Sequence, residues 1–394
     1  MIHLFINALS ASAGGGLTYV RNVLPCLANR DDVRTTLLVG EMLRGEMVES
    51  TRVTVLNGSY NGGSARRFWH EQRDLPGLIR RSGADVLLST GNFALFRSPV
   101  PQILLSRNAL YTSADFLCDI RQRGDYRLWI DTKVKGGLAR WSVYHADCTV
   151  APSEAFAGDL RQWTGKDVMS IHHGFDRDTF FCAAVPLPQE VQNRVDALEG
   201  SVRILFVSHY NYYRNFETLI RAVGILKAKL HPQPVRLVLT CKLASKENPG
   251  SYQAEIAADL VRLLDLGKEV VELGTVPYEA LHHLYERCDV YATPAYAETF
   301  AHPLVEAMAS RLPVIASDLA VHREICGDAA LYFPRFSPKA LAERILQVVE
   351  SGKQRASMQK AGLVRSLSFN WDNHVEALLV LARRLVARDR RGFT

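Results

Sequence analysis

The sequence predicts an α/β protein built from two parallel-sheet domains, and three observations lead to this fold class. Short apolar runs alternate along the chain with stretches of helical periodicity, as strands and helices do around a parallel sheet covered on both faces. The 394 residues suffice for two domains of ordinary size. A hydrophobic content of 47% with 22% charged residues is typical of a globular chain.

A glycine loop follows the first expected strand. The run 2–8 is strand-like and leads through Gly14, Gly15 and Gly16 into a helical pattern over 17–28. Glycines let the backbone approach a phosphate closely, and a plain tight turn is the alternative explanation. The further strands expected in this half are 35–39, 53–56, 85–89, 102–106 and 146–151, with a helix over 64–82.

Polar residues at the ends of two of these strands are binding candidates, because ligands of parallel sheets bind beyond the carboxyl ends of strands. Asn92 follows the expected strand 85–89, and Arg107 and Asn108 follow the expected strand 102–106. Asn108 would also suit an ordinary turn. Tyr19 stands where a dinucleotide fingerprint needs its third glycine. This argues against a nicotinamide-dependent dehydrogenase.

The second half repeats the alternation of strands and helices. The run 181–200, which contains two prolines, is expected to link a domain over 1–180 to a domain over 201–370. A last helix is expected within 371–394. Strands are expected at 202–208, 236–240, 270–273 and 289–294, and helices at 278–288, 304–310 and 216–230, the last with Asn215 as N-cap.

Two glutamates, Glu298 and Glu306, lie on either side of Pro303. Proline suits the first turn of a helix, so we expect Glu298 in a loop and Glu306 in the first helical turn. The first backbone N–H groups of that helix lack a good cap and suit an anion such as a diphosphate. The residues available as N-cap are Phe300, Ala301 and His302. Alternatively, Glu306 only favours the helix end and Glu298 is a solvated loop residue.

Several ordered segments around these glutamates resemble one known family. They are Glu298-x7-Glu306, the run Leu-Pro-Val-Ile-Ala-Ser-Asp over 312–318, and the run over 324–333 that begins Glu-Ile-Cys-Gly-Asp. The pattern resembles retaining glycosyltransferase family 4. The resemblance implies the GT-B fold, with two Rossmann-like, doubly wound domains facing a central cleft and the last helix, 371–394, packing back on the first domain.

The resemblance also implies roles for individual residues. Glu306 would bind the ribose of a nucleotide-sugar donor, Glu298 would hold the sugar as a catalytic residue, and Arg214 would neutralise the diphosphate through two parallel bonds. Asn108 stands near the position of a family histidine that helps to place the reacting sugar. The other implied donor-binding residues are Gly15, Gly16, His209, Gly274, Val276, Phe300, Ala301 and His302.

Four positions depart from the family pattern. Ala301 and Arg311 stand where the family often has glycine, and His209 replaces a cationic residue with a pH-dependent donor. Asn108 replaces the histidine, so that catalytic histidine cannot be carried over.

The predicted function is transfer of a hexose from a GDP- or UDP-sugar to a hydroxyl of a glycan or lipid-linked glycan, in cell-surface polysaccharide assembly such as that of lipopolysaccharide. A nucleotide-sugar epimerase or phosphorylase on the same fold, or a non-catalytic sugar-nucleotide-binding subunit, is the alternative. No cofactor is expected beyond the donor, and no metal. We do not expect the His172-His173 pair to bind a metal, because no further ligands are spaced to join it. We interpret the Asp176-Arg-Asp178 motif as coincidental, because it is expected in a loop that leaves a domain and not at the strand end that such a metal motif needs.

Charge and hydropathy bear on the partners. The net charge of +6 is mild and argues against nucleic acid. The absence of a run of about 18 apolar residues, and an N-terminus that suits a first strand better than a signal peptide, indicate a cytoplasmic protein. Between Ile120 and Trp141, six basic residues and two tryptophans suggest peripheral contact with an anionic membrane face, and a helix with its aromatics in the core is the alternative.

Overall fold

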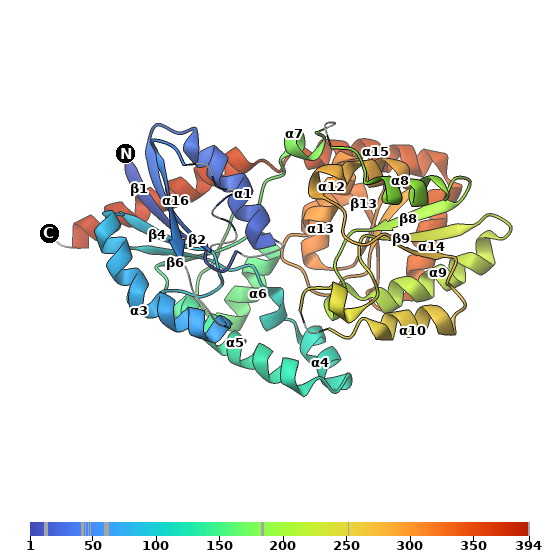
Figure 1. Cartoon of the computed structure of the whole chain (residues 1–394), viewed down its shortest axis with the longest axis horizontal. Helices are drawn as coiled ribbons and strands as arrows, with labels where there is room; N and C mark the ends of the chain where they lie inside the picture. Colours follow the sequence, from blue (N-terminus) through green and yellow to red (C-terminus); the bar gives the residue numbers. More distant parts are fainter. Residues whose placement is uncertain are drawn as a thin grey trace. The chain divides into compact units, whose positions relative to one another are not determined.

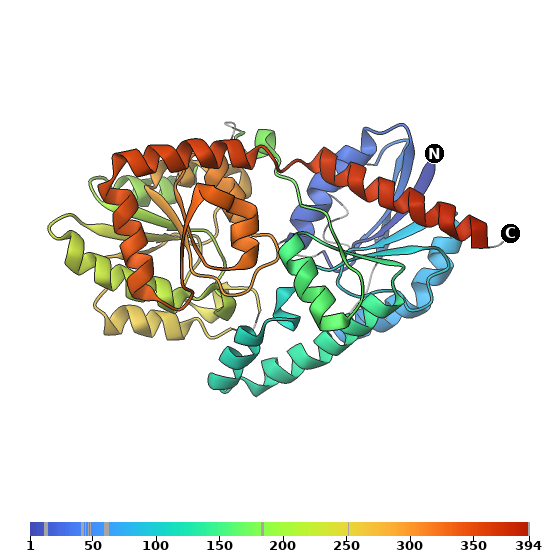
Figure 2. The ribbon, with the colours of Figure 1, turned by 180° about the vertical axis from the view of Figure 1, so that it is seen from behind.

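The computed structural model describes residues 1–11, 15–40, 43, 45, 47, 49–58, 63–182, 185–250 and 252–392. The chain forms two compact units (Figures 1 and 2). Unit 1 comprises residues 1–112, 130–174 and 370–394, and unit 2 comprises residues 113–129 and 175–369. Each unit therefore contains segments that are far apart in the sequence.

Unit 1 is organised around a parallel sheet, with seven strands in the described part of the chain, in the order β3-β2-β1-β4-β5-β6-β7. The order reverses between β1 and β4, which makes this the switch point where doubly wound sheets bind ligands. The strands are β1 Ile2–Asn7, β2 Val33–Gly40, β3 Val53–Gly58, β4 Val86–Ser89, β5 Gln102–Leu105, β6 Cys148–Ala151 and β7 Met169–Ser170.

Helices cover both faces of this sheet (Figure 1). Successive side chains of a strand point to opposite faces. Leu4 of β1 accordingly packs in one cluster with α1 (Gly15–Ala28) and α16 (Trp371–Gly392), while Phe5 packs with α3 (Ser64–Ser82) in another. The other helices of this region are η1 Ala109–Tyr111, α5 Tyr126–His145, whose first turn belongs to unit 2, and α6 Glu154–Thr164.

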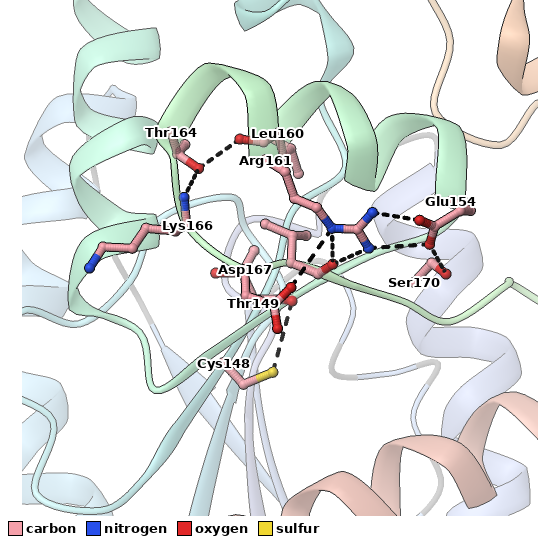
Figure 3. Close-up of polar contacts among 10 residues, drawn as sticks. Cys148, Thr149, Glu154, Leu160, Arg161, Thr164, Lys166, Asp167 and Ser170 are labelled. Atoms are coloured by element: carbon pink, nitrogen blue, oxygen red, sulfur yellow. Dashed lines mark hydrogen bonds and ion pairs between the residues drawn. The ribbon is translucent and has the colours of Figure 1, made fainter.

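A network of polar contacts ties α6 to the last strand of unit 1 (Figure 3). The Arg161 guanidinium donates to the Val168 carbonyl oxygen through Nε at 2.9 Å and to Glu154 Oε1 through Nη1 at 2.5 Å. Ser170 of β7 donates to Glu154 Oε2 at 2.7 Å. The short edge strand is thereby fixed to the helix that precedes it.

Unit 2 contains a second parallel sheet, with six strands in the residues that the structure describes, in the order β10-β9-β8-β11-β12-β13. Its order reverses between β8 and β11. The strands are β8 Val202–Phe206, β9 Val235–Leu239, β10 Val270–Glu272, β11 Val290–Thr293, β12 Val314–Ser317 and β13 Ala330–Phe333.

The helices of unit 2 pack on this sheet and on one another, α9 against β9 and α14, and α12 against α15. They are α4 Ala114–Gln122, α7 Arg177–Phe180, α8 Gln189–Asp196, α9 Phe216–Leu230, α10 Glu255–Leu263, α11 His282–Arg287, α12 His302–Ala309, α13 Ala320–Cys326, α14 Pro338–Glu350 and α15 Gly352–Ser366, with short 3-10 turns η2 Tyr212–Arg214, η3 Ser245–Glu247, η4 Tyr278–Ala280 and η5 Gly327–Ala329.

The predicted fold class is confirmed, with two doubly wound parallel sheets, but several local expectations differ from the structure. Residues 113–129 belong to unit 2 and not to a domain over 1–180. The expected linker 181–200 contains helix α8, and the structure changes units between Gly174 and Phe175. Asn215 stands at the N-cap of α9 in a left-handed conformation without a capping hydrogen bond, and its Nδ2 donates to the Pro294 carbonyl oxygen at 3.1 Å.

Candidate donor site

The predicted donor residues of unit 2 lie on loops that leave the carboxyl ends of its sheet. Strands β8 and β11 flank the switch point, and the loops that follow them carry Arg214 and Glu298. Doubly wound sheets bind ligands at this place. The topology therefore brings together two residues that are 84 positions apart in the sequence.

Arg214 and Glu298 form an ion pair. Arg214 Nη1 donates to Glu298 Oε2 at 2.5 Å, and the two side chains are only 18% and 10% exposed. Burial opposes the charge on Arg214, but the carboxylate outweighs it and the pKa of the guanidinium is raised. Arg214 Nε is buried without a hydrogen-bond partner in the described residues. Glu298 thus holds the guanidinium in place, and Nε remains able to donate a hydrogen bond to a ligand.

His209, the second predicted cationic donor, is exposed on the same loop. Partial desolvation, and then the neighbouring charge of Arg214, lower the pKa of its imidazole. The side chain is therefore predominantly neutral near pH 7. It can offer a single hydrogen bond to a phosphate, but not a second fixed charge.

Hydrogen bonds fix the loop that carries Glu298. The Tyr296 N–H donates to the Tyr213 carbonyl oxygen at 2.9 Å, which joins this loop to the one bearing Arg214. Ser317, at the end of β12, donates to the Ala295 carbonyl oxygen. Together with the Asn215 contact to Pro294, these bonds hold three successive residues ahead of Glu298.

Helix α12 begins without a side-chain cap, as the sequence predicts. Ala301 is its N-cap residue, and Pro303 lies in its first turn. Ala301 has φ of 63°, a left-handed conformation that residues with a Cβ adopt at a cost. Arg311, just beyond the other end of α12, has φ of 56°. Both departures from the family's glycines therefore stand where a glycine would be unstrained.

Glu306 lies in the second turn of α12 and not in the first, because the helix begins at His302. It is buried, 5% exposed, and Oε2 accepts a hydrogen bond from Tyr285 Oη at 2.7 Å. Burial raises the pKa of Glu306 to about 7, against which the Tyr285 bond acts. Near neutral pH this carboxyl group can therefore be an acceptor or a donor.

The expected base-reading turn follows β10. Gly274 has φ of 85°, which favours glycine, and Val276 is buried. A Cβ atom on Gly274 would lie 3.4 Å from Lys242 Cε. Phe300, the first of the predicted diphosphate-binding residues before α12, is also buried, and its ring lies 4.9 Å from that of His302.

The predicted site residues of the first half lie in unit 1. Arg107 connects them: Nη1 donates to the Gly15 carbonyl oxygen at 2.8 Å, and Nη2 donates to that of Thr90 at 2.7 Å. A Cβ atom on Gly16 would lie 3.2 Å from Ala11 Cα, so the turn is tightly packed. Asn108 caps η1 by accepting from the Leu110 N–H at 3.0 Å, a structural role. Gly14 lies outside the described residues.

The two motifs not expected to bind a metal have structural roles. Asp176 caps α7 by accepting from the Thr179 N–H at 3.0 Å. The His173 ring stacks on Trp371 at 5.5 Å, and the His172 carbonyl oxygen faces His374 Nδ1 at 2.8 Å. Among the residues that the structure describes, no group of three or more His, Cys, Asp or Glu side chains could hold a metal ion.

Sequence reasoning missed the buried side chains behind the glutamates. Tyr285 binds Glu306, and Tyr291, stacked on Tyr285 at 6.0 Å, lies within electrostatic reach of Arg214, Glu298 and Glu306. His322 is fully buried, with Nδ1 at 3.0 Å from the Ser317 carbonyl oxygen. None of the three residues belongs to a motif in the sequence, so no local signal could have found them.

Two doubly wound parallel sheets, with a cation and two carboxylates at the switch point of the second, define the class of GT-B glycosyltransferases. The signature described as "Glycosyl transferases group 1" matches residues 189–365, and that described as "Glycosyltransferase Family 4" matches residues 13–179. The chain belongs to this glycosyltransferase family.

Known relatives are distant. The chain is 27% identical over 259 residues to D-inositol 3-phosphate glycosyltransferase of Kineococcus radiotolerans, a match that covers 62% of this chain and 58% of the relative. It is 33% identical over 101 residues to O-antigen chain mannosyltransferase B of Escherichia coli, which covers 26% of each. The chain thus spans less than two thirds of the curated relatives that it matches.

Solved structures share the fold over the whole chain. Sucrose-phosphate synthase of Thermosynechococcus elongatus superposes with a TM-score of 0.77 at 18% identity, covering 98% of this chain and 100% of that one. Anabaena HepE in complex with UDP-glucose gives 0.71 at 16% identity, with coverage of 98% and 100%. At these identities the likeness concerns the fold alone.

Proposed function

We propose that the protein is a retaining glycosyltransferase that moves a hexose from a nucleotide diphosphate sugar, a GDP- or UDP-sugar, to a hydroxyl group of a glycan or lipid-linked glycan in cell-surface polysaccharide assembly. The observation that carries the proposal is the Arg214–Glu298 ion pair beside the uncapped end of α12. A buried cation beside the positive end of a helix dipole, at one edge of the sheet, suits a diphosphate.

The chemistry requires stabilisation of a leaving group. The bond from the anomeric carbon to the phosphate oxygen breaks, and its electron pair leaves on the nucleoside diphosphate. Arg214 and the first N–H groups of α12 offer fixed positive potential where that charge develops. The acceptor oxygen bonds to the anomeric carbon on the face that the diphosphate leaves, and its proton passes to the leaving phosphate. The products are the glycoside and the nucleoside diphosphate.

The contact between Glu298 and Arg214 leaves room for a ligand. Arg214 donates to Glu298 through Nη1, and its Nε has no hydrogen-bond partner among the described residues, so an arriving diphosphate would accept from the remaining donors of the guanidinium. Glu298 would accept from sugar hydroxyls with its remaining lone pairs. Glu306 would accept from the ribose in place of part of its contact with Tyr285. Binding therefore leaves the ion pair intact and does not create an unpaired charge.

The printed names of similar proteins support the donor class. HepE was crystallised with UDP-glucose, and the Escherichia coli relative is named as a mannosyltransferase of the O-antigen chain. These names point to a hexose on a nucleotide diphosphate and to a polysaccharide acceptor. The epimerase, the phosphorylase and the non-catalytic subunit remain as alternatives to be separated by experiment.

A donor screen followed by product analysis tests the function. A thermal-shift panel of nucleotides and nucleotide sugars should give one stabilising group, since a ligand at 100 times its Kd adds about 2.7 kcal/mol. Incubation with that donor and glycan acceptors should then release the nucleoside diphosphate, and proton NMR should show the product anomer to be that of the donor. Conversion of the donor without acceptor would favour the epimerase. Binding without turnover of any acceptor would favour the non-catalytic subunit.

Helix α5 supports a membrane-linked acceptor. Five of its large side chains are exposed: Tyr126, Ile130, Val134, Trp141 and Tyr144 are between 46% and 61% exposed. Its buried residues are the small Gly136, Ala139 and Ser142, with Thr132 and Val143. The two glycines expected to weaken the helix, Gly136 and Gly137, lie within its continuous 20 residues. Of the two tryptophans counted in the sequence, Trp141 is exposed and Trp129 is half-buried.

Basic residues lie on the same helix. Arg127, Lys133 and Arg140 are exposed on α5, whereas Arg123, counted in the sequence with the basic stretch, is paired with Asp119 and Glu217 inside unit 2. Exposed apolar groups flanked by cations suit an anionic lipid surface, where each near-surface cation contributes about 1 kcal/mol. No helix in the described ranges is long and apolar enough to cross a membrane.

Vesicle sedimentation tests this contact. Binding should occur to vesicles with anionic lipid, should weaken at high salt and should fall with Ile130→Ser and Trp141→Ser. Leu263→Ser is the matched control, because Leu263 is 80% exposed but lies on α10 of unit 2. Equal, negligible binding to anionic and neutral vesicles would favour an acceptor without a lipid.

A further inference from the structure

Helix α4 belongs to unit 2, although its sequence stands between β5 and α5. Ser113 begins the helix by accepting from the Phe116 N–H at 3.2 Å, and Phe116 and Ile120 are fully buried. Unit 2 therefore includes a segment, residues 113–129, that is supplied by the first half of the chain (Figure 1). This segment contacts the two loops of the candidate donor site.

The first contact reaches the loop that bears Arg214. The Phe116 ring meets that of Tyr213 edge to face, with centroids 6.2 Å apart and planes at 81°. The Arg214 guanidinium carbon lies 5.3 Å from the centre of the same Tyr213 ring. Aromatic pairs in this geometry are favourable beyond their buried area. Tyr213 is thereby held between α4 and the catalytic cation.

The second contact reaches the loop that bears Glu298. Tyr296, two residues earlier and 4% exposed, donates through Oη to Asp119 Oδ2 at 2.6 Å. The other oxygen of Asp119 accepts from Arg123 Nε at 2.8 Å, and Arg123 Nη1 donates to Glu217 Oε1 of α9 at 3.0 Å. The carboxylate that binds Tyr296 is thus itself held to the body of unit 2.

We propose that α4 is a positioning element of the donor site, in which Asp119, through Tyr296, and Phe116, through Tyr213, set the alignment of Glu298 with Arg214. The two loops are joined at the backbone only by the Tyr296–Tyr213 hydrogen bond among the contacts described above, and α4 holds the side chains of both residues. Asp119 and Phe116 are one turn apart on the helix, so a single rigid element fixes both loops. This inference rests on the proposed function of that site.

Loss of a positioning residue lowers the rate of the reaction and changes the affinity for the substrate much less. A shift of reacting groups by about 1 Å can cost on the order of a hundredfold in rate. Asp119→Ala and Tyr296→Phe should therefore each lower kcat by about tenfold or more, with the KM for the donor changed by less than about threefold. The double variant should lose no more than Asp119→Ala alone, because the hydrogen bond that Tyr296→Phe removes is already absent there.

Asp115→Ala is the matched control. Asp115 lies on α4 one turn before Asp119, but its partner is Arg335, at 2.7 Å. This variant makes the same change of side chain on the same helix and should keep the wild-type kcat. A loss in Asp115→Ala equal to that in Asp119→Ala would overturn the proposal, because it would show only that α4 must stay docked.

Hydrogen–deuterium exchange gives a readout that does not depend on activity. In the full chain, the Asp119→Ala and Tyr296→Phe variants should lose protection in the peptide covering 294–301, and Asp115→Ala should not. If Asp119→Ala does not fold, Tyr296→Phe, which removes one hydroxyl group, decides alone. Unchanged exchange together with wild-type kcat would overturn the proposal. If the wild-type protein transferred no sugar, the proposed function would fail and the exchange result would still decide whether α4 orders the loop.

Discussion

The two sheets carry arginines at their switch points in different electrostatic settings. In unit 2, Arg214 faces Glu298, and the pair is mostly buried. In unit 1, Arg107 donates to the carbonyl oxygens of Gly15 and Thr90, and its guanidinium carbon lies 5.1 Å from the Tyr19 ring centre. No carboxylate pairs with Arg107 in the part of the chain that the structure describes. Burial lowers the pKa of Arg107 to about 10, whereas Glu298 makes that of Arg214 higher than usual.

The two arginines therefore show two ways of holding a cation near a ligand, one paired with a carboxylate and one bound to carbonyl oxygens. The charge of Arg214 is balanced by Glu298 before any ligand arrives, although Nε keeps a donor for the ligand. Among the described residues, the guanidinium of Arg107 contacts the carbonyl dipoles of Gly15 and Thr90 and the ring of Tyr19, and no carboxylate balances its charge. This leaves a net positive potential at the glycine turn of unit 1. Breaking a buried ion pair leaves an uncompensated charge, whereas removal of an unpaired cation does not.

The largest expected effect is that of Arg214→Ala. We expect turnover to fall by about a hundredfold or more, because a fixed donor at the leaving group is lost. We also expect the free energy of unfolding to fall by about 3–5 kcal/mol, since Glu298 would be buried without its partner. Steady-state kinetics and urea unfolding measure the two effects. Arg214→Lys should recover part of both, and full activity in Arg214→Ala would show that the pair has no part in catalysis.

Glu306 provides the converse case, a buried carboxyl group without a cation. Its folded-state pKa of about 7 is raised above the ordinary value of 4.5 by burial. The folded protein therefore binds this proton more tightly than the unfolded chain does. The stability that the proton adds is fully present below about pH 4.5 and is lost as the pH rises through about 7. The loss should be on the order of 3 kcal/mol. Nucleotide affinity should rise over the same range, because only the ionised form offers both oxygens to ribose hydroxyls.

Glu306→Gln should remove this pH dependence from both measurements and weaken nucleotide binding by about 1.5–3 kcal/mol. Urea unfolding and calorimetric titration of the nucleotide between pH 5 and pH 8 provide the comparison. Glu286→Gln, a change at an exposed residue on α11, is the control. If the wild type and Glu306→Gln had parallel pH profiles, the assignment of the raised pKa to this carboxyl group would be wrong.

Arg107→Met should have a smaller effect on stability than the loss of Arg214. The carbonyl oxygens of Gly15 and Thr90 lose their donors, but the cost of burying a charge disappears as well. We expect the free energy of unfolding to fall by about 1 kcal/mol, measured by urea unfolding beside Arg214→Met. A loss in Arg107→Met as large as that in Arg214→Met would remove the distinction between the two arginines.

The smallest expected effects are stabilising and again differ between the units. The described left-handed residues of unit 1 are glycines and Asn92, whereas unit 2 places Ala301, Arg311 and Phe336 in this conformation. A residue with a Cβ atom is strained by about 1–2 kcal/mol in this conformation, and a glycine substitution would remove that strain. Glycine also gains freedom in the unfolded chain, which offsets part of the gain in stability. Ala301→Gly and Arg311→Gly should each raise the free energy of unfolding by about 0.5–1 kcal/mol. A thermal melt of each variant measures this, and a lower Tm would contradict it.

Local patterns predicted the elements well, because strands and helices depend on near neighbours. The helix over 64–82 and the helix over 216–230 have their predicted bounds in α3 and α9. The uncapped start of α12 was also predictable, since capping depends on a few adjacent side chains. The family resemblance is confirmed by the signatures that match both halves of the chain.

Long-range pairing could not be predicted in the same way. Arg214 and Glu298 were expected to face a ligand, and nothing within either segment indicates that they bind each other. The assignment of 113–129 to unit 2 depends on Tyr213, Glu217 and Tyr296, which lie nearly a hundred residues or more away. The burial of Glu306 depends on how α11 packs against α12. The roles proposed for the site residues remain predictions until the variants are measured.

The discontinuity of the units has a consequence for synthesis on the ribosome. Residues 1–112 and 130–174 of unit 1 are translated before the main segment of unit 2, yet Val375, Leu378 and Leu379 of α16 belong to the hydrophobic core of unit 1. The last segment follows residue 369, after the main segment of unit 2 has been translated. At about 5–20 residues per second, the sheet of unit 1 waits on the order of 10–40 s for the helix that covers one of its faces. The sheet of unit 1 is thus translated before that of unit 2 but receives its last core helix after it, which leaves apolar surface for a chaperone to shield in the meantime.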